Sequence, residues 1–131
     1  MSAEKRREEG LRWLAQAQDD WEAGEAPLRA GKLAQAAFLA QQAGEKALKA
    51  LWIPLGLDPW GQGLAQLVRD LPEGMGGALQ PLLPQALALD KLYIPTRYPD
   101  ALPGLTPKEA QKALMDAQAI LKAVEVALGK G

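Results

Sequence analysis

Apolar residues along the chain recur at intervals of three and four positions, which is the spacing of one face of an α-helix. In a first helix, predicted over about residues 3–26, this face carries Leu14, Ala17, Trp21, Gly24 and Leu28. Pro27 should end or kink this helix, and Gly31 should mark the turn after it. A second helix is predicted over about residues 32–53, ahead of Pro54. Its inner face consists mostly of small residues: Leu33, Ala37, Ala40, Gly44, Ala47 and Leu51.

Shorter elements are predicted in the middle of the chain. A turn-rich connector over residues 58–63 precedes a short helix, and a glycine-rich loop over residues 73–77 follows that helix. Pro81 and Pro84 can each lie in the first turn of the next helix, which should end before Pro95. The short helix carries four apolar residues: Leu64, Leu67, Val68 and Leu71.

The last helix has the clearest start signal. Thr106, Pro107 and Glu109 have the spacing of an N-cap, a proline in the first helical position and the partner of a capping box. Gly129 should end this helix. Ala (24) and Leu (23) dominate the chain, whereas Val, Ile and Thr together number eight, so a sheet is not expected. These patterns predict one all-α domain over residues 1–131, an antiparallel up-and-down bundle of four to five helices.

Charge and composition narrow the possible chemistry. The 15 Lys and Arg residues balance 16 Asp and Glu residues, so the net charge of −1 gives no bulk attraction for a polyanion. The chain has no Cys and no His, which excludes thiol and Ser-His-Asp catalysis, zinc fingers and His-based metal sites. The side chains that remain as candidates for chemistry are carboxylates, Lys, Arg and Tyr. We expect a cytoplasmic protein with no membrane segment, no metal and no cofactor.

A first candidate site lies along the second helix. Gln41 and Glu45 lie on one helical face among large apolar groups, in the series Phe38, Gln41, Glu45, Leu48 and Trp52. Because partly buried polar groups need partners, this face predicts a hydrogen-bond network or a ligand. The adjacent face, formed by Gln42, Lys46 and Lys49, is interpreted as solvated, with an exposed pair between Glu45 and Lys49.

A second candidate site follows the predicted end of the helix at Pro95. Arg97 lies between two prolines, in a segment expected to be non-helical, and is flanked by both tyrosines and by two carboxylates. A guanidinium on a rigid loop beside aromatic rings suits phosphate recognition with stacking of a base or ribose. Alternatively, Arg97 pairs with one of these carboxylates and locks the loop onto the bundle. The flanking residues are Asp90, Tyr93, Tyr98 and Asp100.

The four tryptophans divide into two groups. Trp21 and Trp52 fall on predicted helices and are expected to pack in the core. Trp13 and Trp60 are candidates for a protein interface. The charged start of the first helix, residues 4–9, is interpreted as a frayed, solvated helix end.

Two stretches carry a family resemblance. Residues 38–51 (FLAQQAGEKALKAL) and residues 93–100 (YIPTRYPD) together closely resemble the HEPN domain family, named for higher eukaryotes and prokaryotes nucleotide-binding. The resemblance extends over nearly the whole chain. It implies an all-α bundle that commonly forms a homodimer, often partnered with a small nucleotidyltransferase in toxin–antitoxin or stress modules.

The resemblance also shows what this chain lacks. Many HEPN members are metal-independent ribonucleases that use an Arg separated by four to six residues from a His. Arg97 matches the Arg of this motif, but the expected His positions hold Leu102, Pro103 and Gly104. Gln62 stands at another position where relatives often carry His. The binding frame is therefore expected to be retained without its proton-transfer group.

Three hypotheses follow. The first is a noncatalytic nucleotide- or RNA-binding protein, in which Arg97 binds phosphate, Tyr93 or Tyr98 stacks on a base, and Glu45 or Asp90 orients polar groups. The second is an interaction subunit that forms a homodimer and docks a nucleotidyltransferase as a toxin–antitoxin-type partner. The third is a ribonuclease with Asp100 or Glu45 as an atypical base, either with or without a metal ion.

Overall fold

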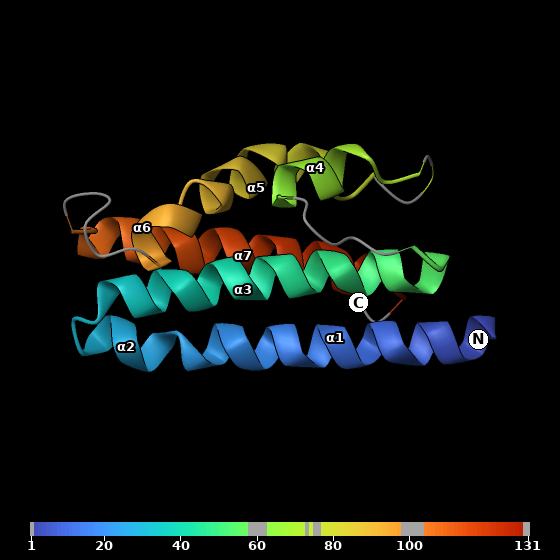
Figure 1. Cartoon of the computed structure of the whole chain (residues 1–131), viewed down its shortest axis with the longest axis horizontal. Coiled ribbons are helices and arrows are strands. Elements are labelled where there is room, and N and C mark those ends of the chain that lie inside the picture. The colour runs from blue at the N-terminus through green and yellow to red at the C-terminus, as the bar shows by residue number, and fades with distance from the viewer. Residues whose placement is uncertain (1, 58–62, 73, 75–76, 98–103, 130–131) are drawn as a thin grey trace.

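The computed structural model describes residues 2–57, 63–72, 74, 77–97 and 104–129. Within these ranges the chain is helical and contains no β-strand (Figure 1). The elements are α1 (Ala3–Ala23), α2 (Glu25–Arg29), α3 (Leu33–Trp52), the 3₁₀ turn η1 (Ile53–Leu55), α4 (Leu64–Arg69), the 3₁₀ turn η2 (Gln80–Leu82), α5 (Leu83–Asp90), α6 (Tyr93–Arg97) and α7 (Pro107–Ala127). The predicted all-α bundle is confirmed.

Helix α3 is the centre of the bundle. Figure 1 shows α1 along one side of α3 and α7 along another, with α4 and α5 in a further layer in which α5 packs on α3 and α7 and α4 packs on α3 and α5. The direction alternates along α1, α3, α5 and α7, so α1 and α3 are antiparallel, as are α5 and α7, whereas α3 and α7 run the same way. The most extensive contacts are those of α3 with α1 and with α7. Helix α3 therefore carries side chains that face three different neighbours.

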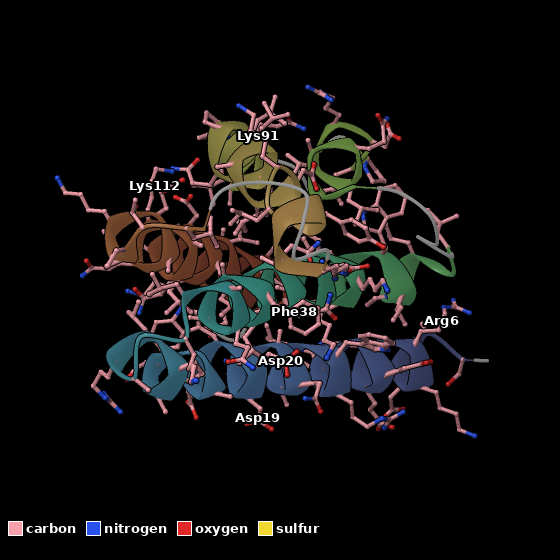
Figure 2. All side chains as sticks on the ribbon, turned by 60° about the vertical axis from the view of Figure 1, so that its left-hand side comes forward. Arg6, Asp19, Asp20, Phe38, Lys91 and Lys112 are labelled. Atoms are coloured by element: carbon pink, nitrogen blue, oxygen red, sulfur yellow. The ribbon has the colours of Figure 1, made fainter. Side chains whose placement is uncertain are left out.

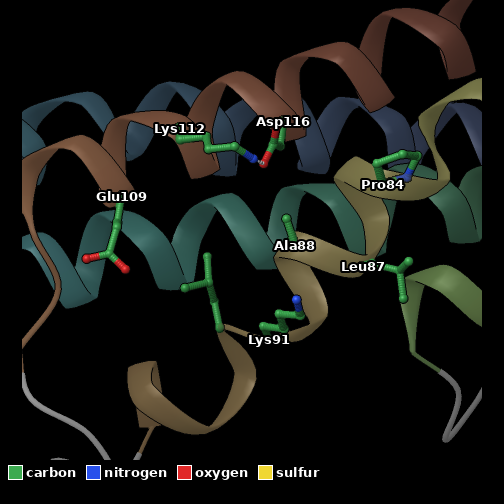
Figure 3. Close-up of a pocket in the computed structure, with 8 residues that line it drawn as sticks. Pro84, Leu87, Ala88, Lys91, Glu109, Lys112 and Asp116 are labelled. Carbon is green, nitrogen blue, oxygen red and sulfur yellow. Dashed lines mark hydrogen bonds and ion pairs between the residues drawn. The ribbon is translucent and has the colours of Figure 1, made fainter.

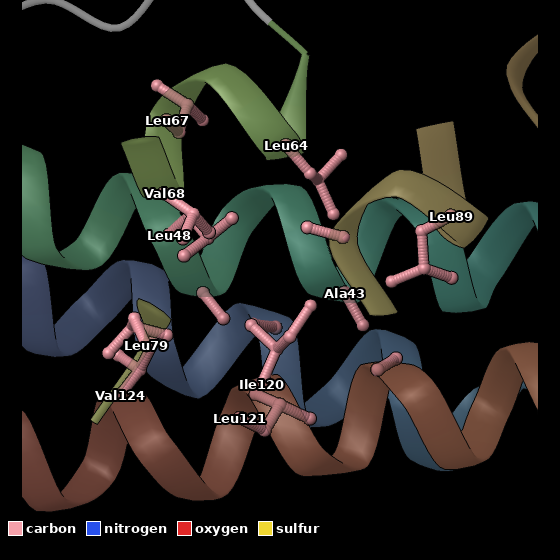
Figure 4. Close-up of a cluster of buried hydrophobic side chains, with 14 of the residues drawn as sticks. Ala43, Leu48, Leu64, Leu67, Val68, Leu79, Leu89, Ile120, Leu121 and Val124 are labelled. Atoms are coloured by element: carbon pink, nitrogen blue, oxygen red, sulfur yellow. The ribbon is translucent and has the colours of Figure 1, made fainter. Parts of the chain in front are cut away.

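Small residues allow this close packing. An added Cβ on Gly44 would lie 2.7 Å from Leu64 and 2.9 Å from Leu89, and one on Gly10 would lie 2.7 Å from the carbonyl oxygen of Ala50. The large core side chains then interlock around α3, mainly from α4, α5 and α7 (Figure 4). The fully buried ones are Leu14, Leu48, Leu51, Leu64, Leu67, Leu79, Leu89, Ile120, Val68 and Val124.

Two tryptophans pack against this core as predicted. The indole N–H of Trp52 donates to the carbonyl oxygen of Leu67 at 3.2 Å, and that of Trp21 donates to the carbonyl oxygen of Leu114 at 2.7 Å. Trp52 is buried and Trp21 is half-buried. Trp13 is also half-buried on α1, and Trp60 lies outside the described residues.

The first helix ends earlier than the sequence predicts, because Pro27 belongs to a separate short helix. The first helix ends at Ala23 and not at residue 26, because the nitrogen of Pro27 cannot donate to the carbonyl of Ala23. Pro27 instead occupies the third position of α2, where the backbone nitrogen needs no helical acceptor. Gly31 then adopts a positive φ of 77° at the predicted turn.

A proline is also the third residue of a short helix near Arg97, and this contradicts the prediction that Arg97 lies in a non-helical segment. The helix preceding Pro95 ends at Asp90, and a new helix, α6, begins at Tyr93. Pro95 is the third residue of α6, so its missing N–H breaks nothing, and the amide of Thr96 closes the turn on the carbonyl of Leu92 at 3.2 Å. The prediction that Arg97 lies in a non-helical segment is therefore wrong.

Both ends of the bundle are fixed by side chains. The capping box of α7 is present, with the hydroxyl of Thr106 accepting from the Glu109 amide at 3.1 Å. The start of α1 is capped by Ser2 rather than frayed, which corrects the interpretation made from the sequence. The guanidinium of Arg7 also donates to the carbonyl oxygen of Leu128 at 3.0 Å, which ties the first helix to the end of the last. No helix among the described residues is long and apolar enough to span a membrane.

Candidate functional site

The site is centred on Arg97, at the end of α6, where this short helix crosses α3. Its Nη2 donates to the side-chain oxygen of Gln41 at 3.1 Å. Its Nη1 lies 3.3 Å from both the carbonyl oxygen of Tyr93 and the hydroxyl of Thr96. All three acceptors are neutral. A guanidinium has five N–H donors, so at least two of them have no partner among the described residues.

Two aromatic rings lie against this guanidinium. The Arg97 Cζ lies 3.9 Å from the ring centroid of Tyr93 and 4.7 Å from that of Phe38. Arg97 is half-buried, whereas 46% of Tyr93 is exposed. Cation–π contacts restrict the guanidinium without neutralising its charge. The site therefore presents a positioned positive charge beside an accessible aromatic ring.

Gln41 supports Arg97 from beneath. Its side chain is only 3% exposed, and its oxygen accepts from Arg97 and also, at 3.0 Å, from the amide nitrogen of Gln42. A buried amide oxygen with two donors is well satisfied. This network confirms the prediction that the polar groups on this face of α3 find partners.

The network continues along α3 toward α1. Gln42 also donates to the carboxylate of Glu45 at 3.4 Å, and Glu45 pairs with Lys49 at 3.4 Å. Lys49 lies over the ring of Trp13 at 5.3 Å and is 7% exposed. Lys46 is half-buried and pairs with Asp20 of α1 at 2.6 Å. The prediction of a solvated face is therefore wrong for Lys49, which is buried where α1 packs on α3, whereas Gln42 and Lys46 are half-buried.

Asp90 has a different role from that of Arg97. Its two carboxylate oxygens accept from the backbone N–H groups of Leu64 at 2.7 Å and Ala65 at 3.0 Å, the first two residues of α4. A carboxylate there satisfies otherwise unpaired amides and interacts favourably with the helix dipole. Asp90 thus joins α5 to α4, and its recorded partners do not include Arg97.

Tyr98 and Asp100 lie outside the described residues, as do Leu102 and Pro103. Their predicted proximity to Arg97 stays a prediction. Within the described ranges, no group of three or more Asp and Glu residues is placed to hold a metal ion.

A second polar region is the groove between α5 and α7 (Figure 3). Its volume is about 440 Å³, and its apolar walls include Leu87, Ala88 and Leu92. Lys112 and Asp116 form an ion pair of 2.8 Å across one turn of α7. Glu109, at one end, belongs to the capping box, and its pKa is held below the ordinary value of 4.5, chiefly by the backbone N–H of Thr106 and then by its hydroxyl.

Sequence reasoning missed two residues of the Arg97 site. Phe38 was expected only as an apolar neighbour of Gln41, and Thr96 was not considered. The signal for Phe38 was available, because it precedes Gln41 by three positions and so shares its helical face. The contact of Thr96 with Arg97 depends on α6 being helical, which the sequence reading excluded.

Fold and site together define an all-α bundle with an arginine-centred polar cluster on its central helix. The sequence model of the HEPN domain family matches residues 11–127, and the chain belongs to this family. No curated protein matches the chain.

Solved structures agree with this assignment. TT1696 from Thermus thermophilus is 42% identical, with a TM-score of 0.81 over 90% of this chain and 97% of that chain. ST0689, described as an archaeal HEPN homologue, is 30% identical, with a TM-score of 0.72 over 91% of this chain and 97% of that chain. An HEPN domain protein from Thermotoga maritima is 27% identical, with a TM-score of 0.51 over 90% and 92% of the two chains.

Proposed function

We propose that this HEPN protein binds nucleotides or RNA at Arg97 without acting as an efficient ribonuclease. The observation that carries the proposal is the Arg97 guanidinium itself. It lies against two aromatic rings, its acceptors among the described residues are neutral, and at least two of its donors have no acceptor among those residues. A planar, charged fork of this kind favours a phosphate group.

Each neighbouring residue has a role in this proposal. Arg97 binds a phosphate oxygen, and the exposed ring of Tyr93 stacks on a base. Gln41 positions the guanidinium and leaves it charged, because an amide oxygen accepts a hydrogen bond without supplying a counter-charge. Glu45 orients polar groups at the edge of the site through Gln42. Tyr98 and Asp100 are proposed to contribute from the adjoining segment.

The noncatalytic part of the proposal rests on the sequence. The chain has no His, so neither subunit of a homodimer could supply an imidazole base. Loss of a general base costs about 10² to 10⁴ in rate. The carboxylate alternative through Glu45 is disfavoured because that side chain already pairs with Lys49 and accepts from Gln42. RNA that stays intact in the presence of the protein, with and without Mg²⁺ or Mn²⁺, is the expected result.

A homodimer and a nucleotidyltransferase partner are part of the proposal as well. Two large apolar side chains of α7 lie strongly exposed, Met115 at 63% and Val126 at 62%, and their spacing of eleven positions places them on the same face of this helix, which we assign to the contact. Light scattering should give the mass of two chains. The docking of a nucleotidyltransferase should survive Arg97→Ala, because it depends on apolar surface and not on the ligand site.

Calorimetric titration with AMP and with a short oligoadenylate tests the central proposal. We expect saturable binding by the wild type and a loss of about tenfold or more for Arg97→Ala, since charge-assisted hydrogen bonds to phosphate contribute about 1.5–3 kcal/mol. Arg97→Lys retains the charge but not the planar fork, so it should restore only part of the affinity.

The matched control is Arg29→Ala. Arg29 is an exposed arginine of α2, paired with Glu25 at 3.7 Å, and it should bind no ligand. Equal affinity in the wild type and in Arg97→Ala, or no saturable binding by the wild type, would overturn the proposal. Thermal unfolding of each variant verifies that the bundle is intact.

A further inference from the structure

A hollow at the seam between α1 and α3 lies outside the Arg97 site. It has a volume of about 370 Å³ and is lined by Arg12, Trp13 and Gln16 of α1 and by Lys46 of α3. We call it the Trp13 pocket. Arg12 and Gln16 are exposed, whereas Trp13 and Lys46 are half-buried, so the pocket opens to solvent at the edge of the seam. Its volume falls within the range of about 300–1,000 Å³ that is typical of small-molecule sites.

Trp13 differs from the other described tryptophans in its hydrogen bonding. The indole N–H groups of Trp21 and Trp52 donate to carbonyl oxygens at 2.7 Å and 3.2 Å, whereas that of Trp13 has no acceptor among the described residues. The buried side-chain atom without a partner in this part of the chain is Gln85 Oε1, so the indole nitrogen of Trp13 is open to solvent. Indole N–H groups usually find a partner when they are buried. A ligand that covers Trp13 must therefore supply the acceptor.

Arg12 provides a second set of donors at the same pocket. Within the described chain its guanidinium forms no hydrogen bond and no ion pair, not even with Glu8 or Glu9, one turn earlier on α1. A guanidinium fork binds a carboxylate through two parallel hydrogen bonds. The pocket thus combines an anion-binding group, Arg12, with an aromatic ring, Trp13.

The other charges of the pocket are already paired. Asp20 pairs with Lys46 at 2.6 Å and also accepts from the side-chain amide of Gln16 at 3.1 Å. Figure 2 shows Asp20 on the side of α1 that faces α3, with Asp19 on the opposite, outer side. The neighbouring ion pair on α3 is neutral as a whole. One positive charge, that of Arg12, is therefore left for a ligand.

From these features we propose that the Trp13 pocket binds a small, planar aromatic carboxylate. The carboxylate accepts from the Arg12 guanidinium and from the Trp13 indole N–H, and the ring of the ligand packs against the part of the indole that lines the pocket. A carboxylate carries one negative charge at neutral pH, which matches the charge of Arg12, whereas a phosphate monoester carries nearly two.

This site goes beyond the proposed function, because it involves neither Arg97 nor a nucleotide. Sequence reasoning had considered Trp13 only as part of a protein interface. The lining of the pocket is local to α1 and α3, so a ligand enters it from solvent without passing between the two helices.

The probe is benzoate, and the readout is the indole N–H signal of Trp13 in proton–nitrogen correlation NMR spectra. The signal that disappears in Trp13→Phe belongs to Trp13. A ligand of this size should have a Kd of about a few millimolar, so titration to about 30 mM at constant ionic strength covers the expected range. In the wild type the Trp13 signal should move saturably. Those of Trp21 and Trp52, which donate inside the bundle, should not.

Two related compounds separate the charge of the ligand from its ring. Benzamide has the ring without the charge and should bind about tenfold more weakly, because a charge-assisted hydrogen bond is lost. Cyclohexanecarboxylate has the charge without the aromatic ring and should bind about two- to fivefold more weakly. These comparisons use the wild-type protein, so they do not depend on the folding of any variant.

Arg12→Gln tests the anion-binding group. Arg12 is exposed, so the bundle should remain intact, and benzoate affinity should fall about tenfold. Arg69→Gln, which changes another exposed arginine at the end of α4, is the matched control and should bind like the wild type. Arg97→Ala should also bind benzoate normally, because Arg97 does not line the Trp13 pocket.

The outcomes separate this proposal from the proposed function. A saturable shift of the Trp13 signal that is weakened in Arg12→Gln and with benzamide supports it. If the signal does not shift, or if benzamide or Arg12→Gln matches benzoate with the wild type, the proposal is wrong. If AMP displaces benzoate, or Arg97→Ala abolishes its binding, benzoate occupies the Arg97 site and the proposal is also wrong. AMP titration alone tests the proposed function, so either proposal can fail while the other stands.

Discussion

The Arg97 site and the groove between α5 and α7 both combine cationic and apolar side chains, yet their charges are arranged in opposite ways. In the groove, Lys112 pairs with Asp116 at 2.8 Å, and the carboxylate of Glu109 accepts from the N-cap residue of α7. At the Arg97 site the recorded acceptors are an amide, a carbonyl and a hydroxyl. The groove is a hollow of about 440 Å³ in which Lys112 and Asp116 already pair with each other, whereas Lys91, which also lines it, has no ion pair among the described residues.

Our proposal therefore rests on how the charged groups are paired and not on the size of a cavity. An anion at Lys112 would compete with the existing ion pair to Asp116, whereas an anion at Arg97 would meet donors held in place by neutral groups and rings. Asp90 and Arg97 differ in the same way. Both were candidate ligand-binding residues, but the carboxylate of Asp90 already accepts from two backbone amides of α4.

Asp90→Ala tests the contrast between Asp90 and Arg97. Of the variants proposed here, it should lower the stability of the bundle most. Two backbone N–H groups of α4 lose their acceptor, so the free energy of unfolding should fall by about 1–2 kcal/mol. AMP affinity should stay within about twofold. Denaturant unfolding and calorimetry measure both. Asp70→Ala, whose carboxylate accepts from Gln66 on the surface, is the control; a tenfold loss of AMP affinity in Asp90→Ala would return Asp90 to the binding site.

Phe38→Leu tests whether ligand affinity depends on how the Arg97 guanidinium is held. It removes one of the two rings that hold the guanidinium and leaves the hydrogen bond to Gln41. AMP affinity should fall about two- to fivefold, since an exposed cation–π contact contributes about 0.5–1 kcal/mol. Leu87→Ala in the groove is the comparison variant and should leave AMP affinity unchanged. Equal losses in both variants would mean that the site does not depend on how Arg97 is held.

Lys112→Gln tests the groove. Lys112 and Asp116 are one turn apart on α7, and 64% of the lysine side chain is exposed, so losing the pair should cost only about 0.5 kcal/mol or less. Binding of AMP and of oligoadenylate should be unaffected. A marked loss of affinity in this variant would show that the groove, and not Arg97, receives the phosphate.

Glu109→Gln should have the smallest effect on stability, and that effect should depend on pH. Because the pKa of Glu109 in the folded protein is lowered, its contribution to stability is fully present above 4.5 and is lost as pH falls through the lowered value. Glu109→Gln removes this contribution. Thermal unfolding at several pH values should show a difference from the wild type above pH 4.5 that shrinks on further acidification. A difference independent of pH would contradict the assignment.

The fold was readable from the sequence because its signals are local. The capping box at Thr106, the small residues of α3 and the apolar spacing of α1 all act within one helix. The error at Arg97 arose because Pro95 was taken to exclude a helix, whereas at Pro27 the expected end or kink is present and only the bound of the first helix differs. Pro27 and Pro95 each lie third in a short helix, and at that position a missing N–H has no structural cost.

The site could be predicted only in part from the sequence, because the residues that contact each other in it are far apart along the chain. Gln41 and Arg97 were both candidates, but their contact joins residues 56 positions apart. The role of Asp90 depends on Leu64, 26 positions earlier, which no local pattern indicates. Lys49 was expected in solvent because the sequence does not show that Trp13 covers it.

The most direct test of the account is AMP binding by Gln41→Glu at neutral pH. The new carboxylate would lie about 3 Å from Arg97 Nη2, would also accept from Gln42, and would stay ionised beside the guanidinium. The bundle should remain folded while AMP affinity falls at least tenfold, and Gln41→Met, which adds no charge, should lose less. Wild-type affinity in Gln41→Glu would show that the charge of Arg97 does not bind the ligand, and would contradict the account.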